Sequence, residues 1–232
     1  MIDLHTHVLP GMDDGAADVN EAIQMLKDSY AQGVTLCAAT PHCKLRSEES
    51  ITEFLNKRDE AYRSLCEAMD CNDVPEIVLG AEVYVDNDIS KYEDISRLCI
   101  EGTCFLLVEL PHSASGAEYS EWLYNLNRRG IVPVVAHISR YDNYRELVSD
   151  FSGVELVYQI NNSRTQDIKG RRFIKKLMTT GYMIIMASDM HNMDLRACDM
   201  KKSYEIMRKK MPEYADDLFT NNANLIINLA RE

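Results

Sequence analysis

Short runs of apolar, often β-branched residues alternate along the chain with longer amphipathic stretches. Seven of these runs are predicted to be strands: Ile2–His5, Val34–Ala39, Glu76–Glu82, Phe105–Leu110, Ile131–Ala136, Val154–Ile160 and Met183–Ala187. Between most of them, apolar residues recur every three to four positions, which is the spacing of an amphipathic helix. The alternation of strand and helix predicts an α/β fold with a parallel sheet covered by helices.

Several predicted helices have recognisable start and stop residues. Asp18, with Glu21 three positions later, predicts a capping box, and Gly33 predicts the end of that helix. Ser47 is expected to cap a helix that runs towards Met69. Further helices are predicted around Trp122–Leu126 before Gly130, over Ile168–Thr180 before Gly181, and over Asn224–Ala230.

The number of strand–helix units limits the architecture. Seven units in 232 residues predict a distorted (β/α)7 barrel, because eight units typically need about 250 residues. An open, doubly wound sheet is the alternative. No repeat, linker or low-complexity tract divides the chain, so residues 1–232 are expected to form a single domain.

Charge and composition exclude several classes of function. The chain has 25 Lys and Arg against 37 Asp and Glu, a net charge of −12, which argues against binding to nucleic acid or to an anionic membrane surface. The apolar runs are too short to span a bilayer, which takes roughly 18 residues, so no membrane insertion is expected. The N-terminus lacks the features of a signal peptide. Seven cysteines without a Cys-x-x-Cys pair favour reduced thiols and a cytoplasmic location.

Residues able to bind metals follow six of the seven predicted strands. They are His5 and His7, His42, Glu82, Glu109, His137, and finally Asp189 and His191. In a (β/α) barrel the chemistry lies at these carboxyl ends of the strands. His5/His7 and Asp189/His191 are spaced two apart, so in extended backbone each pair shares one face. If the barrel closes, its first and last strands become neighbours and the two pairs converge.

The types of these residues indicate a metal centre. Imidazole and carboxylate ligands together suit Mn, Fe or Zn, and the donors are more than one ion needs, so two or three ions are expected. Such sites serve displacement at phosphorus or hydrolysis at carbonyl carbon. The alternatives are purely structural: His42 would be a loop residue, and Glu82 and Glu109 would each form an ion pair at the barrel rim. Asp14, between Asp13 and Gly15, is typical of a turn.

Two arginines lie close in sequence to the predicted ligands. Arg140 follows His137 by three positions, and Arg196 follows His191 by five. An arginine beside metal ions is suited to bidentate capture of an anionic oxygen group such as phosphate. The alternative is that both are surface residues. Cys43 lies beside His42 but lacks a Cys-x5-Arg loop, so it is not expected to be a nucleophile.

The motifs taken together resemble a known family. The run from Asp3 to Ala16, DLHTHVLPGMDDGA, resembles the opening of the PHP-superfamily phosphoesterases, and more narrowly the manganese-dependent protein-tyrosine phosphatases of bacterial capsular and exopolysaccharide biosynthesis. Further similar segments are Ala39–His42, Leu79–Glu82, Leu107–Pro111, Ala136–Tyr141, Gln159–Asn161 and Ser188–Asn192. The likeness extends from residue 1 to about residue 196.

This resemblance implies a PHP-type, TIM-like barrel that holds three metal ions. The first ion would bind His5, His7, Glu82 and Asp189; the second would share Glu82 and add Glu109 and His137; the third would bind Asp14, His42 and His191. Mn²⁺ is expected, with Fe, Zn, Co or Mg as alternatives. Arg140 and Arg196 match arginines that bind the phosphate group. The segment Asn162–Arg164 departs from the pattern, where smaller residues are usual, and could alter substrate choice.

The resemblance also implies an activity and a partner. The expected reaction is hydrolysis of phosphotyrosine in the tail of an autophosphorylated bacterial tyrosine kinase that regulates capsule or exopolysaccharide synthesis. A small-molecule phosphatase, such as histidinol phosphatase, is one alternative. A metal-dependent amidohydrolase is another, although no lysine stands at a predicted strand end. A non-catalytic module would be expected to have lost some of the ligands.

Overall fold

The computed structural model describes residues 1–70, 72–112 and 116–228, and its strands form two parallel sheets. The first sheet has the order β1 (Ile2–Thr6), β2 (Leu36–Ala39), β4 (Glu76–Leu79). The second has the order β3 (His42–Lys44), β5 (Glu82–Tyr84), β6 (Phe105–Glu109), β7 (Val132–Val135), β8 (Val157–Asn161), β9 (Met183–Ala187). The predicted α/β class with parallel strands is confirmed.

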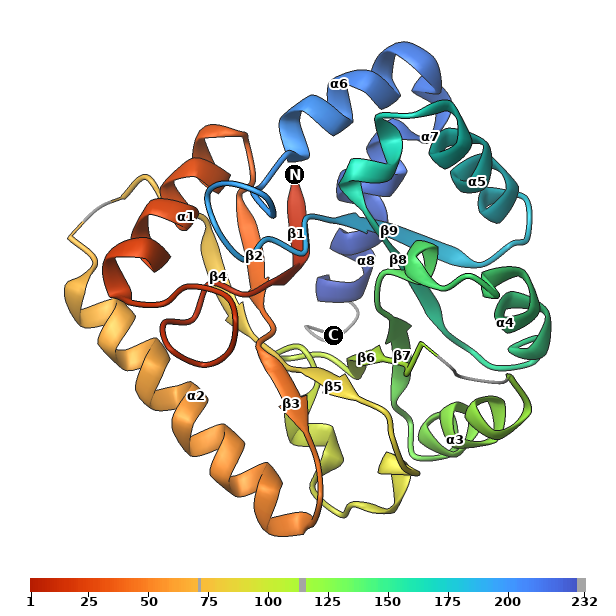
Figure 1. Ribbon diagram of the computed structural model, residues 1–232, viewed down its shortest axis with the longest axis horizontal. Coiled ribbons are helices and arrows are strands. Elements are labelled where there is room, and N and C mark those ends of the chain that lie inside the picture. The colour runs from red at the N-terminus through yellow and green to blue at the C-terminus, as the bar shows by residue number, and fades with distance from the viewer. Residues whose placement is uncertain (71, 113–115, 229–232) are drawn as a thin grey trace.

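Most helices lie outside the strands (Figure 1). They are α1 (Val19–Ala31), α2 (Glu48–Ala68), α3 (Gly116–Arg128), α4 (Tyr144–Asp150), α5 (Ile168–Met178), α6 (Met200–Lys210), α7 (Pro212–Asp216) and α8 (Asn222–Asn228). Short 3-10 turns are η1 (Ile89–Lys91), η2 (Ile95–Leu98), η3 (Ile138–Arg140) and η4 (Asn162–Thr165), and η5 (Asp217–Asn221) is a π-helical turn.

The predicted helix caps are present, with one difference. The Asp18 carboxylate accepts hydrogen bonds from the backbone of Asn20 and Glu21, and Ser47 forms a capping box with Ser50. The Glu21 carboxylate, however, accepts from the backbone N–H of Ala17 rather than from that of the cap residue. The last predicted helix begins earlier than expected, at residue 222, and its predicted end lies outside the described residues.

One predicted strand is interrupted, and another is followed by a short strand that was not predicted. The expected strand Glu76–Glu82 is two strands, β4 and β5, which belong to different sheets and are separated at Gly80. In the same way β2 leads through Thr40 and Pro41 into β3, a three-residue strand without an apolar run that the sequence pattern did not indicate. The Gly80 N–H donates to the Ala39 carbonyl across the interruption, at 2.9 Å.

The ends of β1 and β9 adjoin, although the sheets do not join into one closed barrel within the described residues. Thr6 and Met190 form an isolated parallel bridge. The Asp189 N–H donates to the His5 carbonyl at 2.9 Å, and the His7 N–H donates to that of Met190 at 3.0 Å. These bonds place the segment after β9 directly beside the end of β1.

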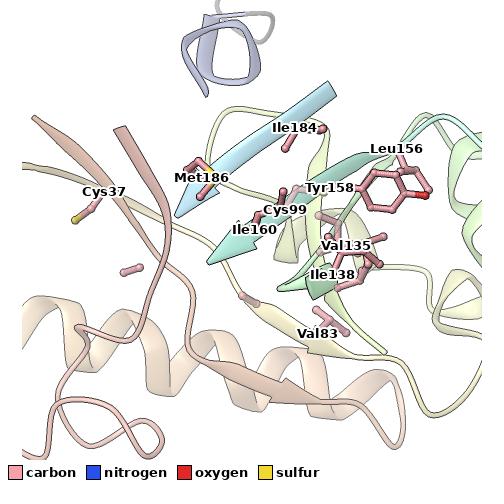
Figure 2. Close-up of a cluster of buried hydrophobic side chains, with 14 of the residues drawn as sticks. Cys37, Val83, Cys99, Val135, Ile138, Leu156, Tyr158, Ile160, Ile184 and Met186 are labelled. Atoms are coloured by element: carbon pink, nitrogen blue, oxygen red, sulfur yellow. The ribbon is translucent and has the colours of Figure 1, made fainter. Parts of the chain in front are cut away.

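The strands carry apolar side chains on both faces, and two buried clusters result. The larger cluster packs strands against the surrounding helices; Figure 2 shows part of it, with Val135 of β7, Tyr158 and Ile160 of β8, and Ile184 and Met186 of β9. The smaller cluster collects the alternate strand residues Ile2, Leu4, Leu36, Ala38, Val78, Phe105, Leu107, Val134, Val157 and Ile185. Ala223, Ile226 and Ile227 of α8 complete that smaller cluster.

No helix in the described part of the chain combines the length and apolar character that crossing a membrane requires.

Candidate metal centre

All nine residues that the sequence analysis named as metal ligands lie together, on strands of both sheets and on the loops between strands and helices. His5 lies in β1, His42 begins β3, Glu82 begins β5 and Glu109 ends β6. The other five, His7, Asp14, His137, Asp189 and His191, lie in loops that follow strands. His137 and Asp189 have positive φ angles of 33° and 54°, conformations that cost roughly 1–3 kcal/mol and that cluster at functional sites.

Glu82 lies at the centre of this group and is almost fully buried. Its Oε2 atom lies 2.9 Å from His42 Nδ1, 3.2 Å from His5 Nε2 and 3.4 Å from His7 Nε2. Its Oε1 atom lies 3.0 Å from His137 Nε2, which is in turn 3.5 Å from Glu109 Oε1. One carboxylate therefore contacts four imidazoles.

The charges of these buried groups depend strongly on one another. Burial opposes ionisation of Glu82, but the imidazoles of His5, His137 and His42 outweigh it and hold its pKa well below the usual range. Burial would also lower the pKa of His5, yet the carboxylates of Glu82 and Asp189 raise it to about 9. Without bound cations, proton-carrying imidazoles balance the carboxylates.

Asp14 completes a second group of donors at the mouth of the site. Its Oδ1 atom lies 3.4 Å from both His42 Nε2 and His191 Nε2. Burial, followed by the nearby His7 and Arg196, lowers the pKa of His191 to about 4. His191 is therefore neutral at physiological pH, the form in which imidazole binds a metal. This geometry favours Asp14 as a ligand over the turn residue that its local sequence indicates.

Three polar residues that were not among the predicted ligands orient the histidines. Asp13 accepts from His7 Nδ1 at 2.7 Å and from the His42 backbone N–H at 2.8 Å. On β8, Gln159 Oε1 lies 3.1 Å from His5 Nδ1, and Gln159 donates to Asn161, which donates to Asp189. Partners of this kind fix the ring orientation of metal-binding histidines.

Both predicted arginines point to Asp189 and line an adjoining cleft of about 570 Å³. Arg140 Nη2 lies 2.6 Å from Asp189 Oδ2, and Arg196 Nη2 lies 2.8 Å from Oδ1. Burial alone would raise the pKa of Asp189. His5 and these two guanidinium groups outweigh that effect and lower the pKa to about 2. Arg140 and Arg196 thus lie between the buried carboxylate of Asp189 and open solvent.

The donor set fits divalent transition-metal ions. Donor atoms of His5, His7 and Asp189 lie within 4.8 Å of one another, and so do those of three further groups: His7, His42 and His191; His42, Glu82 and Glu109; and Asp13, Asp14 and His42. Glu82 Oε2 and His191 Nε2 are buried without a hydrogen bond of acceptable geometry. Buried polar atoms of this kind normally have a partner, and mixed imidazole and carboxylate donors suit Mn²⁺, Fe²⁺ or Zn²⁺.

Cys43 differs from the other residues near the site. Its side chain is buried, and burial raises the pKa of its thiol to about 12, with only a small opposing effect from Arg58. A thiol that is not ionised near neutral pH is a poor nucleophile. The structure therefore agrees with the expectation that Cys43 takes no part in the chemistry.

Comparisons with known proteins agree with these observations. The family described as "Capsular polysaccharide synthesis, CpsB/CapC" matches residues 1–228. The chain is 30% identical to the tyrosine-protein phosphatase CpsB of Streptococcus pneumoniae, over 98% of both chains. It is 27% identical to the tyrosine-protein phosphatase YwqE of Bacillus subtilis, over 98% of this chain and 91% of that protein.

A solved structure has a similar fold. It comes from work on YwqE of Bacillus subtilis and CpsB of Streptococcus pneumoniae, described as metal-dependent tyrosine phosphatases. The match has a TM-score of 0.79 with 24% identity, and covers 98% of this chain and 94% of the other.

Proposed function

The chain belongs to the CpsB/CapC family of capsular polysaccharide synthesis proteins, and from this premise we propose that it is a metal-dependent protein-tyrosine phosphatase. The observation that carries the proposal is the meeting of nine imidazole and carboxylate side chains around Glu82, next to two arginines at the edge of a cleft. Relatives of similar length are named as tyrosine-protein phosphatases.

We assign the nine residues to two or three ions, with Mn²⁺ preferred. His5, His7, Glu82 and Asp189 would hold the first; Glu82, Glu109 and His137 the second; and Asp14, His42 and His191 the third. The chemistry that ions supply in such sites is an activated water at neutral pH and electrostatic stabilisation of a phosphoryl group.

The protein's own residues bind and orient the substrate. The guanidinium groups of Arg140 and Arg196 line the cleft and can donate paired hydrogen bonds to phosphoryl oxygens. Their ion pairs with Asp189 hold both groups in place before substrate arrives. A tyrosine leaving group has a pKa near 10, so it needs less help from a general acid than an alkyl alcohol does. Aryl phosphates are therefore the favoured substrates.

The sheets support a finer description of the fold. We propose that they form one distorted (β/α)7 barrel in a single domain over residues 1–232. In its support, β2 continues into β3, β4 continues into β5, and the Thr6–Met190 bridge joins the first and last strands. Ligands from both sheets meet in one site, which neither sheet could form alone.

The family also suggests the setting of the reaction. We propose that the substrate is a phosphotyrosine-bearing tail of a bacterial tyrosine kinase in the cytoplasm, and that its dephosphorylation regulates capsule or exopolysaccharide synthesis. The net charge of −12 makes nucleic acid an unsuitable partner.

The proposal is tested by comparing substrates under one set of conditions. With added Mn²⁺, kcat/KM for a phosphotyrosyl peptide and for p-nitrophenyl phosphate should exceed that for a phosphoseryl peptide or for histidinol phosphate. EDTA should abolish the activity, and His5→Ala or Asp189→Ala should remove both activity and bound metal. If histidinol phosphate were the best substrate by about tenfold, a difference of 1.4 kcal/mol, the small-molecule phosphatase would replace the present proposal.

A further inference from the structure

A second cleft of about 440 Å³ adjoins the candidate active site and is lined by cations. Among the residues that the structure describes, its charged lining residues are Arg145 of α4, Arg164 of η4, and Lys169, Arg172 and Lys176 of α5, and none is a carboxylate. This basic groove is unusual in a chain with a net charge of −12.

The cations of the basic groove form no ion pairs with the described carboxylates, although Arg164 acts at longer range to lower the pKa of Asp167. Within the described residues, none of the five lies within 4.0 Å of a carboxylate oxygen. Lys169, Arg172 and Lys176 are exposed and follow one face of α5 at intervals of three and four residues. Their charge is therefore available to an external anion.

The wall between the basic groove and the catalytic cleft contains two unpaired donors. Ser139 and Arg164 line both cavities. Ser139 Oγ and Arg164 Nε are buried and have no hydrogen-bond partner among the described residues. Leaving such a donor unsatisfied costs roughly 1–3 kcal/mol, and an anionic oxygen at this wall could accept from either.

Two aromatic residues line the basic groove together with its cations. The rings of Tyr144 and Phe173 pack edge to face with their centroids 4.5 Å apart, and both residues line the cavity. Aromatic and cationic lining residues in one cavity suit a ligand that joins an aryl ring to a dianionic group. Phosphotyrosine has that form, with a charge of about −1.5 to −2 at neutral pH and three acceptor oxygens.

We propose that the basic groove binds a second phosphotyrosine of the same polypeptide while the first occupies the catalytic cleft. The inference rests on the proposed phosphatase function and adds a substrate preference to it: multiply phosphorylated segments are dephosphorylated before singly phosphorylated ones.

The test uses synthetic peptides of one sequence with two tyrosines, in a series with one to five residues between them. The wild-type protein with Mn²⁺ should show kcat/KM at least about tenfold higher for the best doubly phosphorylated peptide than for its singly phosphorylated form. Arg172→Glu/Lys176→Glu should reduce this ratio to within about twofold, through KM rather than kcat. Turnover of p-nitrophenyl phosphate, which fills only the catalytic cleft, should not change.

The matched control is Lys175→Glu/Lys209→Glu, which makes the same change in net charge at exposed residues that do not line the groove. An equal loss of preference in this control would attribute the effect to long-range charge and overturn the proposal. No preference in the wild type would also overturn it. So would an equal kcat/KM when glutamate replaces the second phosphotyrosine, because the groove would then bind any acidic residue.

A binding measurement separates this inference from the proposed function. If no phosphotyrosyl peptide is hydrolysed, the phosphatase proposal fails. Fluorescence anisotropy with the labelled doubly phosphorylated peptide then tests whether the basic groove binds phosphotyrosine. Binding that Arg172→Glu/Lys176→Glu weakens about tenfold, and the control variant does not, supports a phosphotyrosine site. Equal binding by both variants refutes it.

Discussion

Asp189 is surrounded by positively charged side chains. Arg140 and Arg196 each contact one of its carboxylate oxygens, and His5 lies 3.5 Å away. The two arginines are partly exposed whereas Asp189 is buried, so each guanidinium reaches inward from the cleft. Arg196 also reaches Asp14, with its Nη1 atom 3.5 Å from Asp14 Oδ2, so this guanidinium lies between two of the predicted ligands.

The first residue-scale prediction concerns these arginines. Arg140→Ala or Arg196→Ala should lower kcat/KM for phosphotyrosyl peptide by roughly 30–1,000-fold, because each removes charge-assisted hydrogen bonds used in the transition state. Metal content, measured by elemental analysis, should not change. Arg→Lys at either position should recover only part of the loss, since lysine lacks the planar fork. A change below about threefold would show that the phosphate is held without the arginines.

A second residue-scale prediction concerns Asp13. Asp13→Asn should weaken Mn²⁺ binding by about 10–100-fold, because the amide cannot supply the negative charge that polarises His7. Isothermal titration with Mn²⁺ measures the affinity directly. Asp18→Asn, which alters a carboxylate at a helix cap with no contact to a ligand, is the matched control and should bind Mn²⁺ like the wild type. Equal affinities for the two variants would contradict the role given to Asp13.

Residue types at strand ends indicated most histidines and acids of the candidate site, whereas Asp14 was indicated only by the family resemblance. His5 and His7 are rare residue types spaced two apart after an apolar run, so they stand out. Asp13 and Gln159 do not, because the run Asp13-Asp14-Gly15 indicates a turn and a single amide in a buried strand has no distinctive spacing. Their roles depend on contacts across many residues, such as the 3.1 Å approach of Gln159 to His5, that no local pattern contains.

At the scale of elements, the loop between β1 and α1 supplies Asp13 and Asp14. This loop folds back on the strand end: the Ala16 N–H donates to the His7 carbonyl at 3.0 Å. Gly15 makes the close approach available, because a Cβ there would lie 2.2 Å from the His7 carbonyl oxygen. The break between β4 and β5, by contrast, was not predictable, because the apolar run continues across Gly80, and β3 was missed because it has no apolar run.

Gly15→Ala should therefore damage the metal centre through the loop. The backbone of His7 cannot yield by the distance required, so Asp14 should move and at least one Mn²⁺ per chain should be lost in elemental analysis, with most of the activity. Gly102→Ala is the control. Its φ of +72° makes alanine strained by about 1–2 kcal/mol, but a Cβ added there would meet no atom of the described residues within 4 Å, apart from its chain neighbours. That variant should have a lower melting temperature than the wild type and keep its full metal content. Full metal content in Gly15→Ala would exclude this account.

At the scale of the whole molecule, folding concentrates charge at one end of the strands. The smaller apolar cluster fills the space between the sheets with help from α8, while the carboxyl ends of the strands carry the imidazoles and carboxylates. Raised pKa values of His5 and His42 show that, without metal, these residues hold protons to balance the acids. Stability and metal binding are consequently linked to the same protons.

The sign of this linkage follows from His5. Its pKa in the folded protein, about 9, lies above the ordinary value of 6.5, so its stabilising effect is complete below about pH 6.5 and is lost as pH rises towards 9. The raised pKa of His42 acts in the same direction. The melting temperature of the EDTA-treated protein should therefore fall between about pH 6.5 and 8.5, by roughly 5 °C.

Mn²⁺ should reverse this trend, because ligand histidines must be deprotonated and affinity rises with pH. The difference in melting temperature between Mn²⁺-loaded and EDTA-treated protein should widen steadily over the same pH range, since binding to the folded state alone raises its stability. Circular-dichroism melts at matched ionic strength provide the measurement. His5→Gln should make the melting temperature of the EDTA-treated protein depend less on pH. It should also reduce the difference in melting temperature between the Mn²⁺-loaded and EDTA-treated forms. A constant difference across this range would mean that the imidazoles do not exchange their protons for metal ions.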